Sequence, residues 1–367
     1  MNSRRDFIKK TGVVASVAGF FPNISKGLKP TAEEIIIGHG DYKYKVDKEW
    51  AKISVNSTPL FNCHEMVQDQ KGRLIMLGDH VTNNILIFDK SGKLLDKWGS
   101  SFPGGHGLTL SKEGTEDFLL ITDCGWYNDR NGNWNKQSGF IMKTDTNGRL
   151  IFTLGHPRTI GIYKDNEPFM PTETAVAPNG DIFVADGYGS DYIIHYSAKG
   201  EYIRHFGGRN NTNPDHNLKN AHGVAVDTRD PKNLKLICTS RDENCFKIFT
   251  MDGKYVEKIE LPGMHICRPV IHNDNIYAGV CWSKGKDGKT DWGDSGFTVI
   301  LDKNNKVISC PGGEAPVYKD GKLQPTLQAP NPIFDHGHDV CVDDDANVYV
   351  CQWKAKYTPP VKLTRVQ

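Results

Sequence analysis

A unit of four short strands recurs along most of this chain, and it constrains the fold more than any other feature. The stretch AVAPNGDIFVADGYGSDYIIHYSAKGEYIRHFGG at 175–208 contains one complete unit. In other units, turns such as DKSGK, DTNGR and DKNNK separate the third strand from the fourth. Four strands joined by hairpin turns, repeated at intervals of roughly 40 to 50 residues, are typical of β-propeller blades. We therefore predict an all-β fold.

Six units can be counted after residue 60, which predicts a six-bladed β-propeller. Their first strands begin near six residues in a common register: His64, His106, Glu173, His222, Arg268 and His338. The sixth unit stops one strand short, at VKLTRVQ. The segment YKYKVDKEW at 42–50 has the alternating pattern of a half-buried strand. We expect this N-terminal strand to complete the last blade and close the ring.

Three of these six positions hold a histidine beside a glycine at the start of an apolar strand. GGHGLTL contains His106, NAHGVAVD contains His222, and HGHDVCVD contains His338. The innermost strands of a propeller line its central channel, so these alternate blades would direct three imidazoles at one point on the axis. Three imidazole nitrogens with an open fourth position are typical of catalytic zinc. We predict zinc, or another divalent transition metal, at this point.

Asp339 follows the last of these histidines and indicates a second, harder cation. Together with the backbone carbonyls of Leu108 and Met66, its carboxylate could hold calcium. A carboxylate that accepts hydrogen bonds from strand amides explains Asp339 equally well.

The second strand of each unit ends at the mouth of the channel and supplies a polar and aromatic rim. Tyr188 is the predicted catalytic base, because a nearby cation and Arg241 would favour its phenolate form. The candidate substrate-binding residues are His64, His80, Trp126, Trp282, His336 and Trp353. His64 could instead be a further metal ligand, a proton carrier or part of the channel lining. The tryptophans could form the floor for a sugar or another flat-faced substrate, and packing between blades explains them equally well.

These motifs resemble the NHL-repeat propellers and, among them, the peptidyl-α-hydroxyglycine α-amidating lyases. The resemblance extends from about residue 60 onward, and it is strongest in the complete unit above, in AHGVAVD, in SRDENCFKIF and in FDHGHDVCVDDDANVYV. It implies a zinc site, a calcium site and two catalytic residues. The residues concerned are His106, His222 and His338 for zinc, Asp339, Leu108 and Met66 for calcium, and Tyr188 and Arg241 for catalysis.

Two departures from that family bear on the substrate. Its Arg-Gly-Asp-His sequence reads LGDH at 77–80 here, and its Met-Pro-His-Asp reads HGHD at 336–339. The family's disulfide cysteines are also poorly matched. Because Leu77 replaces an arginine that would bind a negatively charged peptide substrate, we expect a different, neutral substrate.

The combined prediction is an exported, metal-dependent enzyme, a zinc-dependent lyase that cleaves a C–N or C–O bond in a small hydroxylated substrate. Two substrates stay open, a peptidyl-hydroxyglycine-like compound and a sugar derivative. Two other functions also stay open. One is a non-catalytic NHL-type propeller that binds a ligand or protein, and the other is a metal-dependent hydrolase of the lactonase type.

The motif SRRDFIK at 3–9, followed by a short apolar stretch, is typical of a twin-arginine export signal. We assign residues 1–30 to this signal and 31–367 to the propeller, and we expect a periplasmic or extracellular monomer. No membrane span is expected beyond a signal that is retained rather than cleaved. Lys+Arg 45 against Asp+Glu 44 argues against nucleic-acid binding, which needs a basic excess. The nine cysteines, without a Cys-x-x-Cys pair, are expected to be buried free thiols, of which a pair or two could oxidise after export.

Overall fold

The computed structural model describes residues 34–129 and 131–366, and from Ile35 onward the chain forms one compact unit. The predicted export signal lies outside the described residues. Within them, the only helical segment is one 3-10 turn, η1 (Arg241–Glu243). The described part contains no helix long and apolar enough to cross a membrane.

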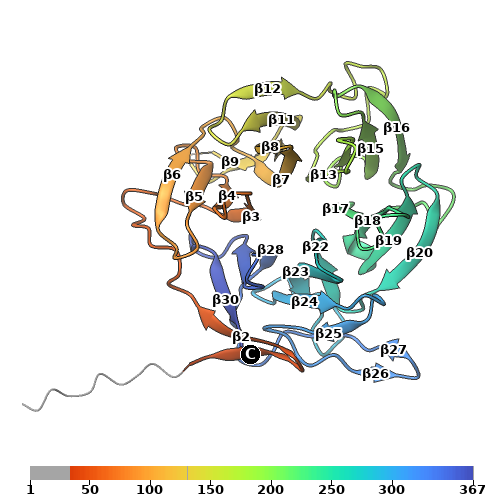
Figure 1. Cartoon of the computed structure of the whole chain (residues 1–367). Coiled ribbons are helices and arrows are strands. Elements are labelled where there is room, and N and C mark those ends of the chain that lie inside the picture. Colours follow the sequence, from red (N-terminus) through yellow and green to blue (C-terminus); the bar gives the residue numbers. More distant parts are fainter. Residues whose placement is uncertain (1–33, 130, 367) are drawn as a thin grey trace, which may run out of the picture. The chain divides into compact units, whose positions relative to one another are not determined.

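Six antiparallel sheets of four or five strands surround a central axis, as the sequence predicts (Figure 1). The first three blades follow one another along the chain. Blade 1 contains β3 (Cys63–Gln68), β4 (Leu74–Gly78), β5 (Ile85–Phe88) and β6 (Leu94–Trp98). Blade 2 contains β7 (Gly105–Glu113), β8 (Glu116–Asp123), β11 (Phe140–Asp145) and β12 (Leu150–Thr153). Blade 3 contains β13 (Glu173–Val176), β14 (Ile182–Ala185), β15 (Tyr192–Tyr196) and β16 (Tyr202–Gly207).

The remaining blades have the same order, with additions. Blade 4 contains β17 (Val224–Asp227), β18 (Lys235–Ser240), β19 (Cys245–Thr250) and β20 (Tyr255–Glu260). Blade 5 contains β21 (Met264–Ile266), β22 (Val270–His272), β23 (Asn275–Ser283), β24 (Phe297–Leu301) and β25 (Val307–Ser309). Two small hairpins lie in the insertions, β9 (Trp126–Asn128) with β10 (Trp134–Lys136), and β26 (Tyr318–Lys319) with β27 (Lys322–Leu323).

Blade 6 is built from both ends of the described chain. It contains β28 (Gly337–Val342), β29 (Val348–Gln352) and β30 (Val361–Arg365), followed by β2 (Tyr42–Asp47) and β1 (Ile36–His39). The red strand β2 lies antiparallel beside the blue strand β30, with Tyr44 opposite Arg365 (Figure 1). The predicted closing strand is therefore confirmed, and β1 adds a fifth strand that the sequence pattern did not indicate.

The hydrophobic core is divided among the contacts between neighbouring blades. One cluster joins Ile75, Leu77 and Ile85 of blade 1 to Leu108 and Ile121 of blade 2, and each of these is at most 1 % exposed. A middle strand is thus covered on both faces, which is why it reads as a continuous apolar run. Full burial of one such side chain contributes about 1.5–3 kcal/mol. All nine cysteines are buried and free, as expected.

Candidate metal centre

Four histidines converge at one end of the axial channel. His64, His106 and His338 belong to the innermost strands β3, β7 and β28, and His222 lies just before β17. Each is at most 6 % exposed. The ring centroids of the predicted triad are 4.7 Å apart for His106–His222, 4.7 Å for His106–His338 and 5.0 Å for His222–His338. The structure therefore brings these three residues together, as the alternate-blade spacing predicts.

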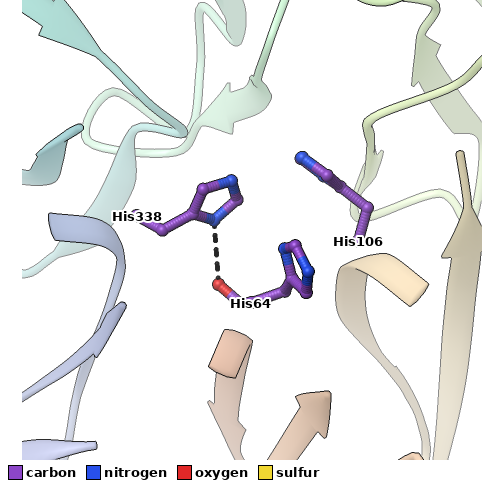
Figure 2. Close-up of side chains that lie close together, drawn as sticks. All are labelled: His64, His106 and His338. Carbon is purple, nitrogen blue, oxygen red and sulfur yellow. Dashed lines mark hydrogen bonds between the residues drawn. The ribbon is translucent and has the colours of Figure 1, made fainter. Parts of the chain in front are cut away.

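His64 joins this group as a fourth candidate ligand. Its ring centroid is 5.1 Å from those of His106 and His338, and the ligand nitrogens of these three residues all lie within 4.8 Å of one another. Figure 2 shows the three rings turned toward a common space. Nε2 of His64 is 3.3 Å from Oδ2 of Asp79, which leaves its Nδ1 free to act as a ligand. His106 and His338 are thus common to two possible triads, one completed by His222 and the other by His64.

The hydrogen bonds of two histidines fix which nitrogen faces the axis. Nδ1 of His106 is 2.8 Å from the carbonyl of Thr172, and Nδ1 of His338 is 3.1 Å from the carbonyl of His64 (Figure 2). A carbonyl can only accept, so both Nδ1 atoms carry the proton and both Nε2 atoms present a lone pair. This is the orientation that metal-binding histidines commonly show.

Several of these buried nitrogens lack a hydrogen-bond partner. They include Nε2 of His338 and Nδ1 of both His64 and His222. An unsatisfied buried polar atom costs about 1–3 kcal/mol, so a native fold rarely leaves several of them together. His64 and His338 belong to the group whose ligand atoms lie within 4.8 Å of one another, so a metal ion fits as the missing partner of these two nitrogens.

The electrostatics of the centre keep the imidazoles neutral. Burial lowers the pKa of His106, His222 and His338 well below the ordinary value, and the neighbouring imidazoles and Arg241 lower it further. A neutral imidazole binds a metal without first losing a proton. At neutral pH, the three side chains are therefore in the form that a divalent ion requires.

Tyr188 lies directly against this centre. Its hydroxyl is 3.1 Å from Nε2 of His106 and 3.2 Å from Nε2 of His222. Burial raises the pKa of its phenol, and the guanidinium of Arg241 partly opposes that rise. The tyrosine predicted to transfer a proton is thus in contact with two of the predicted metal ligands, and it is a neutral phenol in the absence of further positive charge.

Arg241 is held in the wall of the channel rather than in solvent. It is 3 % exposed, and its Nη2 is 2.9 Å from Sγ of Cys267 while its Nε donates to the carbonyl of Ile266 at 3.3 Å. Burial alone would raise the pKa of Cys267, but hydrogen bonds from Cys281 and Arg241 lower it. Arg241 therefore supplies a fixed positive charge whose field reaches Tyr188 and the histidines.

The predicted calcium site is not supported, because an arginine side chain occupies it. The guanidinium of Arg268 binds both carboxylate oxygens of Asp339, at 2.9 Å and 2.8 Å. It also donates to the carbonyls of Leu108 at 3.0 Å and Met66 at 3.3 Å. These are the three groups that were expected to coordinate the ion. They do not fit calcium here, since a tethered cation already lies among them.

Two further carboxylates belong to this ion cluster, which the sequence analysis did not recognise. Oε2 of Glu65 is 3.3 Å from Nη1 of Arg268, and Oε2 of Glu173 is 3.6 Å from its Nε. Burial and the neighbouring Glu173 raise the pKa of Glu65 well above its usual value, although Arg268 opposes this. The cluster therefore holds one arginine and three acids, Glu65, Glu173 and Asp339.

The other predicted rim residues divide into two groups. Trp126 lies edge-on to Tyr188 with ring centroids 5.6 Å apart, while Trp282, His336 and Trp353 form a mutually contacting set at 5.6–5.7 Å. His80 is separate, with its Nδ1 2.9 Å from Oγ1 of Thr82. Trp134 and Trp292 were not among the residues predicted from the sequence, although both lie close to the predicted tryptophans, Trp134 to Trp126 and Trp292 to Trp282.

Comparisons with known proteins find sequence similarity to peptidyl-α-hydroxyglycine α-amidating lyases. A probable peptidyl-α-hydroxyglycine α-amidating lyase of Caenorhabditis elegans is 28% identical over 202 residues, which are 53% of this chain and 49% of that protein. Peptidyl-α-hydroxyglycine α-amidating lyase 1 of Drosophila melanogaster is 34% identical over 120 residues, 32% of this chain and 19% of that protein. The chain resembles the amidating lyases. It spans about half the length of the first relative and less of the second, and no family model matches it.

Other matches extend the resemblance to the fold. NHL repeat-containing protein 3 of Mus musculus is 26% identical over 59% of this chain and 66% of its own. Among solved structures, a gluconolactonase from Xanthomonas campestris aligns with TM-score 0.53 and 12% identity over 89% of this chain and 90% of that chain. A streptogramin B lyase aligns with TM-score 0.50 and 15% identity over 83% and 94%. At these identities, the two structures establish the shared propeller fold alone.

Proposed function

We propose that this protein is an exported, metal-dependent lyase that cleaves a C–N or C–O bond in a small hydroxylated substrate. The observation that carries the proposal is the contact of the Tyr188 hydroxyl with two axial histidines whose neighbours have unpartnered buried nitrogens. The amidating-lyase relatives support the same reaction class. The motif SRRDFIK supports export by the twin-arginine route.

The residues present fit a zinc ion or a similar divalent metal. His106, His222 and His338 would hold it, with His64 as a further candidate ligand. When bound, such an ion supplies a Lewis acid for a substrate oxygen and positive charge beside the phenol of Tyr188.

The chain's own residues would handle the proton. Elimination from a carbinolamide or hemiacetal-like carbon removes the proton of the hydroxyl, forms a C=O bond and breaks the bond to the leaving nitrogen or oxygen. That leaving atom receives a proton, so the reaction balances without water. Tyr188 is placed to take or relay this proton, and Arg241 would stabilise negative charge that develops during the transfer.

A metal and activity assay tests this proposal. We expect the purified protein to contain one divalent ion per chain and to release an aldehyde from a neutral carbinolamide. Release of glyoxylate from the anionic N-benzoyl-α-hydroxyglycine tests the peptidyl-hydroxyglycine-like substrate that also stays open. His106→Ala, His222→Ala and His338→Ala should each remove most of the metal, because two imidazoles hold zinc poorly. His195→Ala is the control, since His195 is equally buried but pairs with Asp181 away from the axis. Full metal content in the triple variant would contradict the assigned site.

A further inference from the structure

A continuous row of aromatic side chains extends outward from the metal centre. Tyr188 contacts Trp126, and four more tryptophans continue from there. The ring-centroid distances are 5.3 Å for Trp126–Trp134, 6.4 Å for Trp134–Trp353, 5.6 Å for Trp353–Trp282 and 5.2 Å for Trp282–Trp292. Three separate segments supply them: the hairpin β9–β10, the end of β23 with its following loop, and the loop after β29. Segments from three different blades thus bring their tryptophans into contact.

Part of this row lines a cavity of about 660 Å³. Its walls include Phe61, Trp134, Trp353 and Tyr357, with Asn62 and Asn128 among the polar groups. Trp134 is 47% exposed and Tyr357 60% exposed, so these rings do not serve as ordinary core. The volume lies within the range of small-molecule sites.

The charged groups around the cavity are largely compensated by one another. Nζ of Lys356 is 3.2 Å from Asp294 and 3.1 Å from Asp335. The carboxylate of Asp129 accepts hydrogen bonds from the backbone of Asn131 and from the backbone and side chain of Asn133. Nζ of Lys354 lies 5.9 Å from the centroid of the Trp353 ring. An ionic ligand would therefore have to compete with pairs already formed, and a neutral ligand would not.

Buried polar atoms beside the row lack partners. They are Oδ1 of Asn128, Nε1 of Trp282 and Nδ1 of His336, whose side chain is 3% exposed as a residue. This set combines an acceptor and a donor with an imidazole nitrogen that can act as either. Of the three, Asn128 lines the cavity, so a hydroxyl group of a ligand there can donate to its Oδ1.

We propose that the aromatic row binds a neutral sugar ring and that the substrate is a sugar derivative. A pyranose has an apolar C–H face that packs on an indole ring and a hydroxylated edge that makes hydrogen bonds. The aromatic walls, the compensated charges and the unpartnered Oδ1 of Asn128 match these features together. Sugar binding itself depends only on the aromatic row and its cavity. The claim that this sugar is part of the substrate rests on the proposed lyase function.

Binding of neutral saccharides tests the proposal directly. The probes are methyl β-glucoside, cellobiose, maltose, lactose, xylobiose and N,N′-diacetylchitobiose, followed by calorimetry and by tryptophan fluorescence. We expect saturable binding of at least one probe, weakened about tenfold or more by Trp134→Ala and by Trp353→Ala, since loss of one stacked ring is worth about a factor of ten. Trp98→Phe is the control, because Trp98 lies on the outer strand β6.

The outcomes separate this proposal from the lyase proposal. His338→Ala should lose metal and turnover but keep saccharide binding. No saturable binding by any probe up to tens of millimolar would overturn the sugar proposal, as would tighter, Trp134-dependent binding of the neutral peptide N-acetyl-glycyl-glycinamide. Release of glyoxylate that is unaffected by Trp134→Ala and Trp353→Ala would leave the lyase proposal intact and exclude the sugar. Saccharide binding by a protein that holds no metal and shows no turnover would exclude the lyase proposal, and the proposal that the aromatic row binds a sugar would stand.

Discussion

The side chain of Arg268 occupies the position in the axial channel where the sequence predicts a calcium ion. Its guanidinium contacts Asp339 and the carbonyls of Leu108 and Met66, the set that resembles a calcium site in sequence. Sequence reasoning placed Arg268 and His338 in the same axial register, with Asp339 one residue further along the chain. The register shows which residues surround the axis but not where each side chain points. It could therefore not show that the Arg268 side chain reaches the carboxylate of Asp339.

Removing this arginine should create the site that it occupies. Arg268→Ala leaves Asp339, Glu65 and two carbonyls around an unfilled space, so we expect the variant to bind calcium and to be stabilised by it. Terbium luminescence and the calcium dependence of the melting temperature measure this. The wild-type protein should show neither response. Terbium binding on the axis of the wild type would contradict the role given to Arg268.

Tyr188 should be separable from the metal site. Tyr188→Phe removes only the hydroxyl, so metal content and melting temperature should stay nearly unchanged while turnover falls roughly 10²–10⁴-fold, the usual worth of a positioned acid or base. Steady-state kinetics on a substrate that the wild type turns over provides the measurement. A fully active variant would remove Tyr188 from the mechanism.

At the scale of elements, the strands follow from the sequence more closely than the insertions do. The repeated apolar runs predicted the blades and the closing strand β2, because a half-buried or fully buried strand has a clear pattern. The hairpin β9–β10 consists of two three-residue strands with mixed polar residues, and the extra strand β1 has only four residues, IIGH; neither was predicted as a strand. The aromatic row was not predicted either. Trp134 and Trp292 reach the other tryptophans because of the path of the connecting segments, and no periodic sequence pattern indicates that path.

The closing strand should carry a measurable part of the stability. Tyr44 on β2 is fully buried, and the Arg365 guanidinium packs 5.3 Å from its ring centroid and donates to its hydroxyl at 3.1 Å. Tyr44→Ala should lower the free energy of unfolding by about 3–5 kcal/mol, as other large-to-small changes in a core do. Urea denaturation measures this. Tyr357→Ala is the matched control, because Tyr357 is 60% exposed and should change stability by less than about 0.5 kcal/mol.

For the whole molecule, the axial histidines should make the metal-free protein sensitive to acid. Their folded-state pKa values lie below the ordinary 6.5, so below that pH the unfolded chain binds protons that the folded protein does not. Stability should be fully present above pH 6.5 and fall as the pH decreases, by up to about 1.4 kcal/mol per pH unit for each histidine. Urea titrations of chelated protein from pH 7 down to about pH 5 measure this slope. A variant with all three residues changed to glutamine should lose it, and equal slopes would contradict the prediction.

The pairing of β2 with β30 also determines when the ring can be completed. The hydrogen bond between Tyr44 and Arg365 joins residues 321 positions apart, far beyond the range over which most strands in this fold find their neighbours. During synthesis, β2 emerges early with only β1 beside it, and its second partner, β30, is made after every other described strand. Bringing such distant segments together carries a large loop-closure entropy, and contacts of this range slow folding. The pairing of β2, which is made early, with β30, which is made last, is therefore expected to be the final step of folding. Until that step, the ring is open and the backbone edges that join β2 to β30 are unpaired.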